Sequence, residues 1–150
     1  MNNAKERKKA GQVVWITGLS GAGKSTLASA LVKRLRAHDD TILLLDGDEI
    51  REFLSVNEIG GPDYSREKRI ELGLRYARLC NILATQGFTV VIGTISLFEE
   101  VHRWNRAHLP RYFEVYLKVP LQELRRRDPK DIYRRFDAGQ LKGVAGLDRN

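Results

Sequence analysis

The stretch GLSGAGKST, residues 18–26, constrains the fold of this chain more than any other feature. Four residues separate Gly18 from Gly23-Lys24-Ser25, which is the spacing of a phosphate-binding loop. Glycines let consecutive backbone N–H groups converge on one phosphate, since no Cβ crowds the turn. The lysine then reaches the β- and γ-phosphates, and the serine hydroxyl is placed to ligate Mg²⁺. The stretch therefore predicts a site for a nucleoside triphosphate.

The segments on either side of the loop supply the context that such a site requires. Residues 12–17, QVVWIT, are mostly β-branched or aromatic and predict a buried strand. After the loop we expect a helix that begins at Lys24, with an apolar stripe at Leu27, Ala30, Leu31 and Leu35. The positive end of this helix adds to the attraction for phosphate. Strand, glycine loop and helix together predict that the chain binds a nucleoside triphosphate.

Strands and helices alternate along the rest of the chain. Apolar runs predict further strands over residues 41–46, 88–95 and 112–119. Periodicity predicts helices from Ser65, as N-cap, to Gln86, over 98–109, and from Pro120 continuously through LRRRDPKDIYRRF. This alternation predicts an α/β fold in three layers, with a parallel sheet and helices on both faces. Ligands of such sheets bind beyond the carboxyl ends of the strands.

Composition limits the remaining possibilities. A chain of 150 residues predicts one domain, over 12–150, after a charged lead-in over 1–11. The net charge of +7 suits either nucleic acid or phosphates. Because the basic residues are not interleaved with aromatics, we expect a small phosphorylated ligand and no nucleic acid. No apolar run is long enough for a bilayer, and the single Cys80 suits a reducing compartment, so we expect a cytoplasmic protein without a membrane contact.

Polar residues follow three of the predicted strands. DGDEIR places Asp46, Asp48 and Arg51 near the expected γ-phosphate, where a carboxylate holds the magnesium shell or accepts a proton from a hydroxyl. The alternative is a helix N-cap followed by a solvated face. Thr94 and Ser96 fit ligand contact and plain turn chemistry almost equally well. The arginines of residues 125–135 either close over ATP or form a solvated basic helix.

A series of segments in this order resembles the adenylylsulfate (APS) kinase family: GLSGAGKST, DGDEIR, YSREKR, TISLF, FEVYLKVPL and RDPKDIYRR. The resemblance covers residues 12–148 and implies the P-loop kinase fold. It implies phosphorylation of the ribose 3′-hydroxyl of adenosine 5′-phosphosulfate by Mg·ATP, giving PAPS in sulfate assimilation. It also implies a homodimer.

The resemblance carries roles over to individual positions. Lys24, Asp46 and Asp48 would be catalytic, with Asp48 near the acceptor hydroxyl and Asp46 supporting it. A mobile lid over about 125–147 would bring Arg127 to ATP. ATP would also be bound by Gly18, Leu19, Ser20, Gly21, Ala22, Gly23, Lys24, Ser25 and Thr26, with Mg²⁺ on Ser25. The nucleotide acceptor would contact Asp48, Arg51, Tyr64, Arg69, Ile95, Ser96, Lys142 and Val144.

The chain departs from the family pattern in the half that binds the acceptor. The family usually has Glu-Asn where this chain has Glu71-Leu72, and SPF where it has Ser96-Leu97-Phe98. The second of two aromatics that stack on the acceptor base is Val144 here, which removes about 1–3 kcal/mol of base binding if the stacking resembles that on single-stranded nucleic acid. The chain also stops at Asn150, before the last strand and helix of the family, so we expect a fragment.

Two alternatives to an APS kinase therefore stay open. The first is a related enzyme with another nucleotide acceptor, such as cytidine diphosphoramidate in capsule-sugar modification; a smaller base suits the missing aromatic. The second is a nucleotide-binding module that no longer transfers phosphate. The intact Lys24, Ser25, Asp46 and Asp48 argue against the second alternative.

Overall fold

The computed structural model describes residues 9–54 and 65–147, which form an α/β fold around one parallel sheet. The strands are β1 (Gln12–Gly18), β2 (Ile42–Asp46), β3 (Thr89–Thr94) and β4 (Tyr112–Leu117), in the order β2-β3-β1-β4. The helices are α1 (Lys24–Leu35), α2 (Gly47–Phe53), α3 (Arg66–Thr85), α4 (Glu99–His108), α5 (Leu121–Arg127) and α6 (Ile132–Asp137). The predicted fold class is confirmed.

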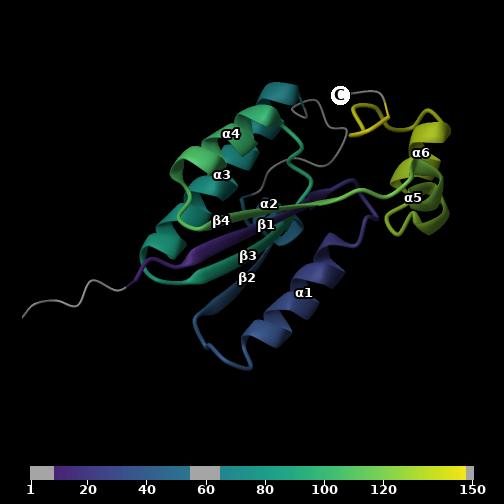
Figure 1. Cartoon of the computed structure of the whole chain (residues 1–150). Helices are drawn as coiled ribbons and strands as arrows, with labels where there is room; N and C mark the ends of the chain where they lie inside the picture. The colour runs from purple at the N-terminus through teal and green to yellow at the C-terminus, as the bar shows by residue number, and fades with distance from the viewer. Residues whose placement is uncertain (1–8, 55–64, 148–150) are drawn as a thin grey trace, which may run out of the picture.

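Helices cover both faces of this sheet, with α1 on one side and α3 and α4 on the other (Figure 1). Successive residues of the central strand β1 serve opposite faces: Trp15 packs with the α3 and α4 side, and Ile16 packs with α1. Because both faces are covered, apolar residues of β1 and β3 are buried on both faces of the sheet, as in WI of β1 and VVI of β3. The parallel pairing brings the carboxyl ends of β1, β2 and β3 to one edge of the sheet.

Helix α3 has the ends that its sequence predicts. The Ser65 side chain accepts a hydrogen bond from the backbone N–H of Lys68, and Gly87 follows the helix with a φ of 99°. Cys80 is completely buried in this helix, and burial raises the pKa of its thiol to about 12. Gly11, assigned from sequence to the lead-in, is buried and donates its N–H to the Ala84 carbonyl at 2.8 Å.

The buried face of α1 differs from the predicted stripe. Ala28 and Val32 are buried, whereas Leu27 is 38% exposed and Ala30 is also exposed. Leu31 and Leu35 are partly buried, as an outer layer of the same cluster. Both sets of residues have helical spacing, so periodicity alone does not choose between them. Packing against Ile16, Ile42 and Val91 of the sheet selects the face with Ala28 and Val32.

The basic segment after Pro120 is two helices and not one, so the continuous helix predicted there is wrong. Pro129 has no N–H to donate, and it disfavours helical geometry at the residue before it. Helix α5 ends at Arg127, and the Asp128 carboxylate accepts hydrogen bonds from the backbone N–H groups of Tyr133 and Arg134. Across residues 9–54 and 65–147, none of the helices is long and apolar enough to cross a bilayer.

We expect the two faces of α1 to differ in their contribution to stability. Val32→Ala should lower the free energy of unfolding by about 2 kcal/mol, since it removes buried carbon and leaves a cavity. Leu27→Ala should cost below about 1 kcal/mol, because that side chain is partly in water and alanine favours a helix. Urea denaturation of both variants measures the difference, and a larger loss in Leu27→Ala would contradict the assignment of the buried face.

Candidate functional site

A cavity of about 420 Å³ lies where the carboxyl ends of the strands meet the N-terminus of α1. Its wall includes most of the site residues predicted from sequence: Ser20, Gly21, Gly23, Lys24, Ser25, Thr26, Asp46, Asp48, Arg51, Arg69, Ile95, Ser96 and Arg127. Gly18 ends β1, and Leu19 and Ala22 belong to an apolar cluster with Leu124 and Tyr133. The loop therefore presents its polar members to the cavity and its apolar members to the α5–α6 segment (residues 121–137).

The phosphate-binding loop has the backbone conformation that its glycines predict. Gly21 and Gly23 have φ values of 77° and 96°, in the left-handed region that favours glycine. The Lys24 ammonium donates to the Leu19 carbonyl at 2.9 Å. Burial lowers the pKa of Lys24 to about 8; Asp48 opposes this effect. The lysine is therefore a partly desolvated cation beside the N-terminus of α1, where phosphate oxygens are attracted.

Asp46, at the end of β2, connects the loop to the next helix. Its carboxylate accepts hydrogen bonds from the Ser25 hydroxyl and from the Asp48 backbone N–H, both at 2.8 Å. The second bond makes Asp46 the N-cap of α2, so the capping alternative is confirmed for this residue. The hydroxyl of Ser25 and the carboxylate of Asp46 are hard oxygen donors, which fit Mg²⁺ when phosphate oxygens complete the shell.

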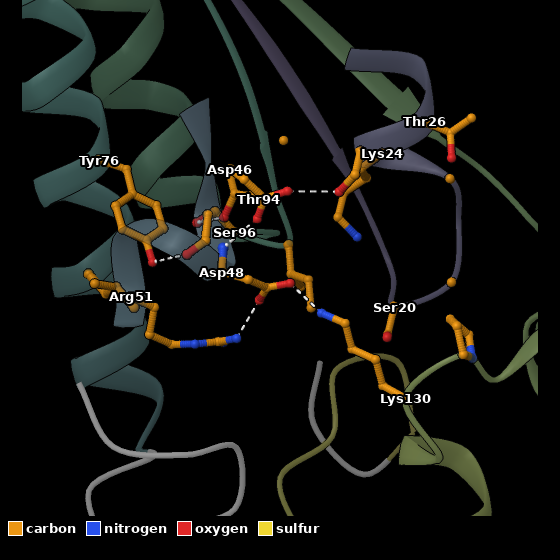
Figure 2. Close-up of a pocket in the computed structure, with 18 of the residues that line it drawn as sticks. Ser20, Lys24, Thr26, Asp46, Asp48, Arg51, Tyr76, Thr94, Ser96 and Lys130 are labelled. Carbon is orange, nitrogen blue, oxygen red and sulfur yellow. Dashed lines mark hydrogen bonds and ion pairs between the residues drawn. The ribbon is translucent and has the colours of Figure 1, made fainter. Parts of the chain in front are cut away.

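Both carboxylate oxygens of Asp48 are paired with cations. Oδ1 accepts from Arg51 on α2, and Oδ2 accepts from Lys130 in the loop between α5 and α6 (Figure 2). Burial alone would raise the pKa of Asp48. The hydrogen bond and charge of the Lys130 ammonium, with smaller contributions from Arg51 and Lys24, nevertheless hold the pKa of this carboxyl below its usual range.

Lys130 was missed by the sequence analysis, and the reason is the expected continuous helix. A helix through residues 121–136 would leave Lys130 as one more solvated cation. The break at Asp128-Pro129 instead places its ammonium against Asp48, 82 residues away in the sequence. A lysine directly after Asp-Pro was the signal that could have found it.

Helix α3 and the end of β3 form the wall opposite the loop. The Arg69 guanidinium lies 5.0 Å from the centroid of the Phe98 ring and donates to the Gly143 carbonyl at 3.3 Å. Thr94 and Ser96 are buried, with their hydroxyl oxygens 3.4 Å apart. Leu72 and Tyr76 also line this wall. The sequence analysis did not single out Tyr76, whose hydroxyl donates to the Gly47 carbonyl at 2.8 Å.

Two further predicted acceptor contacts, Lys142 and Val144, are not among the described residues that line the cavity. Val144 is 5% exposed and packs in an apolar cluster with Ile132 and Leu141, and Lys142 is exposed. Tyr64 lies outside the described residues. Arg127 lies beside the loop, where it donates to the Gly21 carbonyl at 3.3 Å and to Glu123 at 2.7 Å.

Known proteins are similar to this chain in sequence and in fold. The family model described as adenylylsulphate kinase matches residues 10–150. The chain is 37% identical to the cytidine diphosphoramidate kinase of Campylobacter jejuni, over 91% of this chain and 77% of that protein. It is 42% identical to the adenylyl-sulfate kinase of Pseudomonas aeruginosa, over 91% of this chain and 68% of that protein. The Mycobacterium tuberculosis APS kinase CysC in complex with AMPPNP and APS superposes with a TM-score of 0.82 at 33% identity, covering 93% and 80% of the two chains.

The lowered pKa of Lys24 predicts that binding of Mg·ATP takes up protons near pH 8. About half of the lysine is neutral at that pH, and nearby phosphate charge favours the protonated form, so uptake should approach half a proton. At pH 6 the lysine is already charged and uptake through it should vanish. Calorimetric titration in buffers of different ionisation enthalpy measures this proton count.

Lys24→Arg is the matched control for this measurement, because arginine stays charged over the whole range. Uptake at pH 8 should disappear in this variant wherever binding persists. Equal uptake at pH 6 and pH 8 in the wild-type protein would contradict the assignment.

Proposed function

The chain belongs to the adenylylsulfate kinase family of phosphotransferases, and we propose that it transfers the γ-phosphoryl group of Mg·ATP to a ribose hydroxyl of a small acidic nucleotide. The first candidate acceptor is the 3′-hydroxyl of adenosine 5′-phosphosulfate. The observation that carries the proposal is the meeting of Lys24, from the phosphate-binding loop, and Asp48, from the β2–α2 turn, in one cavity. A kinase needs one group that binds the transferred phosphate and a second group that receives the proton of the acceptor hydroxyl.

The donor half of the mechanism uses the loop and the start of α1. Backbone N–H groups of the loop and the Lys24 ammonium bind the β- and γ-phosphates and offset their charge as the phosphoryl group moves. Ser25 and Asp46 would hold Mg²⁺, which supplies further charge stabilisation when bound. Arg127, beside the Gly21 carbonyl, would approach ATP from the lid over about 125–147.

The acceptor half of the mechanism depends on Asp48. Its low pKa keeps the carboxylate ionised at neutral pH, so it can accept a hydrogen bond from the acceptor hydroxyl and orient it. The hydroxyl becomes strongly acidic only as its bond to phosphorus forms, and at that stage Asp48 would take the proton. Arg51 and Arg69 line the same cavity and would bind the anionic group on the acceptor's 5′ side. The hydroxyl attacks the γ-phosphorus, ADP leaves, and the proton passes to Asp48.

A second candidate acceptor is cytidine diphosphoramidate. Leu72 lines the cavity at the position where the family resemblance implies an amide. Val144, in place of the second stacking aromatic, is buried among Ile132 and Leu141, so no ring from this position covers a base. Both differences suit a smaller base, and the Campylobacter jejuni relative carries this activity in its name.

With adenosine 5′-phosphosulfate as the acceptor, the chain would act in cytoplasmic sulfate assimilation, as a homodimer like the family.

Asp48→Asn should keep ATP binding and lose most of kcat. The amide has nearly the same shape as the carboxylate but does not take the proton, and loss of a general base costs about 10²–10⁴-fold. Steady-state kinetics at saturating acceptor, with ATP binding measured separately, checks this result. A rise in the acceptor KM with unchanged kcat would make Asp48 a binding residue instead.

The acceptor is identified by turnover of a panel containing both candidate nucleotides, with the phosphorylated position read by NMR. If adenosine 5′-phosphosulfate is the acceptor, Leu72→Asn should raise its kcat/KM by about tenfold, which is one hydrogen bond of about 1.4 kcal/mol. If the cytidine compound is the acceptor, the same substitution should lower kcat/KM, since it places an unmatched amide against the ligand.

Val144→Phe, which would restore the second aromatic of the family, does not distinguish the two acceptors, because the surroundings of Val144 are already packed. A phenyl ring in the cluster with Ile132 and Leu141 would overfill it at a cost of about 1–3 kcal/mol. Turnover of neither nucleotide, in a protein that binds ATP, would contradict the proposed function and favour a nucleotide-binding module.

A further inference from the structure

One face of α3 carries three cavity residues with different chemistry. Arg69, Leu72 and Tyr76 are spaced three and four residues apart, which places them along one side of the helix. Arg69 supplies positive charge, and Leu72 supplies an apolar surface. Tyr76 is 3% exposed, and its hydroxyl donates to the Gly47 carbonyl, across to the β2–α2 turn (Figure 2).

Gly47 is the residue between the two aspartates, so its position controls theirs. A Cβ at Gly47 would lie 3.0 Å from both the Gly93 carbonyl oxygen and the Cβ of Thr94, which shows how closely the turn packs on the end of β3. The next residue, Asp48, donates its N–H to the Asp46 carboxylate at 2.8 Å. The turn is thus held by β3 on one side, by its own cap, and by the Tyr76 hydroxyl.

Packing alone does not require this hydroxyl. Tyr76 belongs to the apolar cluster between the sheet and helices α3 and α4, and a phenylalanine ring would fill the same volume there. A buried phenol needs a partner, and the partner here is the carbonyl that directly precedes Asp48. The hydroxyl is therefore in a position to act on the reaction, separately from the packing of the ring.

We propose that Tyr76 is a positioning residue for the phosphoryl transfer: through the Gly47 carbonyl it holds Asp48 where the carboxylate faces Lys24 and the acceptor hydroxyl. This inference rests on the proposed function. Among the described residues, three cations act on the Asp48 carboxylate: Arg51 on α2, Lys130 between α5 and α6, and Lys24 at the start of α1. The nearby anion Asp46 accepts from the Asp48 backbone N–H. The combined pull of the cations on the carboxylate makes a fixed backbone at Asp48 necessary for one productive orientation.

The test is a double-mutant cycle between Tyr76→Phe and Asp48→Asn, with kcat measured at saturating Mg·ATP and the acceptor that the wild-type protein uses. Tyr76→Phe should lower kcat about tenfold and leave the KM for ATP within about twofold. In the Asp48→Asn background the same substitution should change kcat by less than about twofold, because the group that it positions is gone. A role in packing alone predicts the same fold-change in both backgrounds.

Two further tyrosines provide matched comparisons. Tyr133 also donates to a backbone carbonyl, that of Ser20 in the phosphate-binding loop, at 2.8 Å. Tyr133→Phe should therefore act on the KM for ATP and show no coupling to Asp48. Tyr112 donates to Glu114 at 3.0 Å and is not among the residues that line the cavity, so Tyr112→Phe should leave kcat unchanged.

The outcomes separate this inference from the function on which it rests. A wild-type kcat in Tyr76→Phe, or an equal loss in both backgrounds, would overturn the inference and leave the proposed role of Asp48 intact. A wild-type kcat in Asp48→Asn would overturn that role, and the inference with it. A loss of kcat in Tyr76→Phe that occurs only when Asp48 is intact would support both the inference and the proposed role of Asp48.

Discussion

The geometry of the cavity depends on the two hydrogen bonds that the Asp46 carboxylate accepts. One comes from the hydroxyl of Ser25 at the start of α1, and the other comes from the backbone of Asp48 at the start of α2. Because β2 ends at Asp46, a single side chain joins a strand end to the first turns of two helices. The start of α1, on the phosphate side of the cavity, and the start of α2, on the side of the acceptor nucleotide, are therefore held in fixed positions relative to each other. Displacement of either helix would break a hydrogen bond to the charged Asp46 carboxylate.

Charged side chains lie near the Asp46 carboxylate, and burial and neighbouring charge shift the pKa values of two of them. Lys24 is desolvated and shifts towards its neutral form, while the cations around Asp48 keep that carboxylate ionised despite burial. The net charge of +7 thus includes cations that converge on one cavity. Lys130 and Arg127 reach the cavity from the α5–α6 segment. Arg126 also belongs to this segment but does not line the cavity; it pairs with Glu123, as Arg127 does. A site that concentrates positive charge around two carboxylates suits ligands that are rich in phosphate.

Local features of this protein followed from its sequence. The glycine loop, the start of α1 at Lys24, the cap at Ser65 and the succession of strands and helices along the chain each depend on residues a few positions apart. Backbone geometry and hydrogen bonds within one or two turns decide such features, so a pattern of residue types is enough to predict them. The family resemblance is confirmed by the match over residues 10–150. Lys24 and Ser25, which it assigned to ATP and Mg²⁺, line the cavity, and these roles stay predictions.

The tertiary structure alone decided the contacts between distant segments. Periodicity admitted two faces of α1, and the sheet selected the one with Val32. The break before α6 brought Lys130 to Asp48, and the packing of α3 on the sheet brought the Tyr76 hydroxyl to the β2–α2 turn. The segment after α6 folds back on Ile132, which puts Val144 in an apolar cluster and not in the cavity wall. These contacts depend on the spatial order of the strands in the sheet, on the rotation of the helices and on the direction of the chain between α5 and α6. The spacing of residue types along one segment does not encode them.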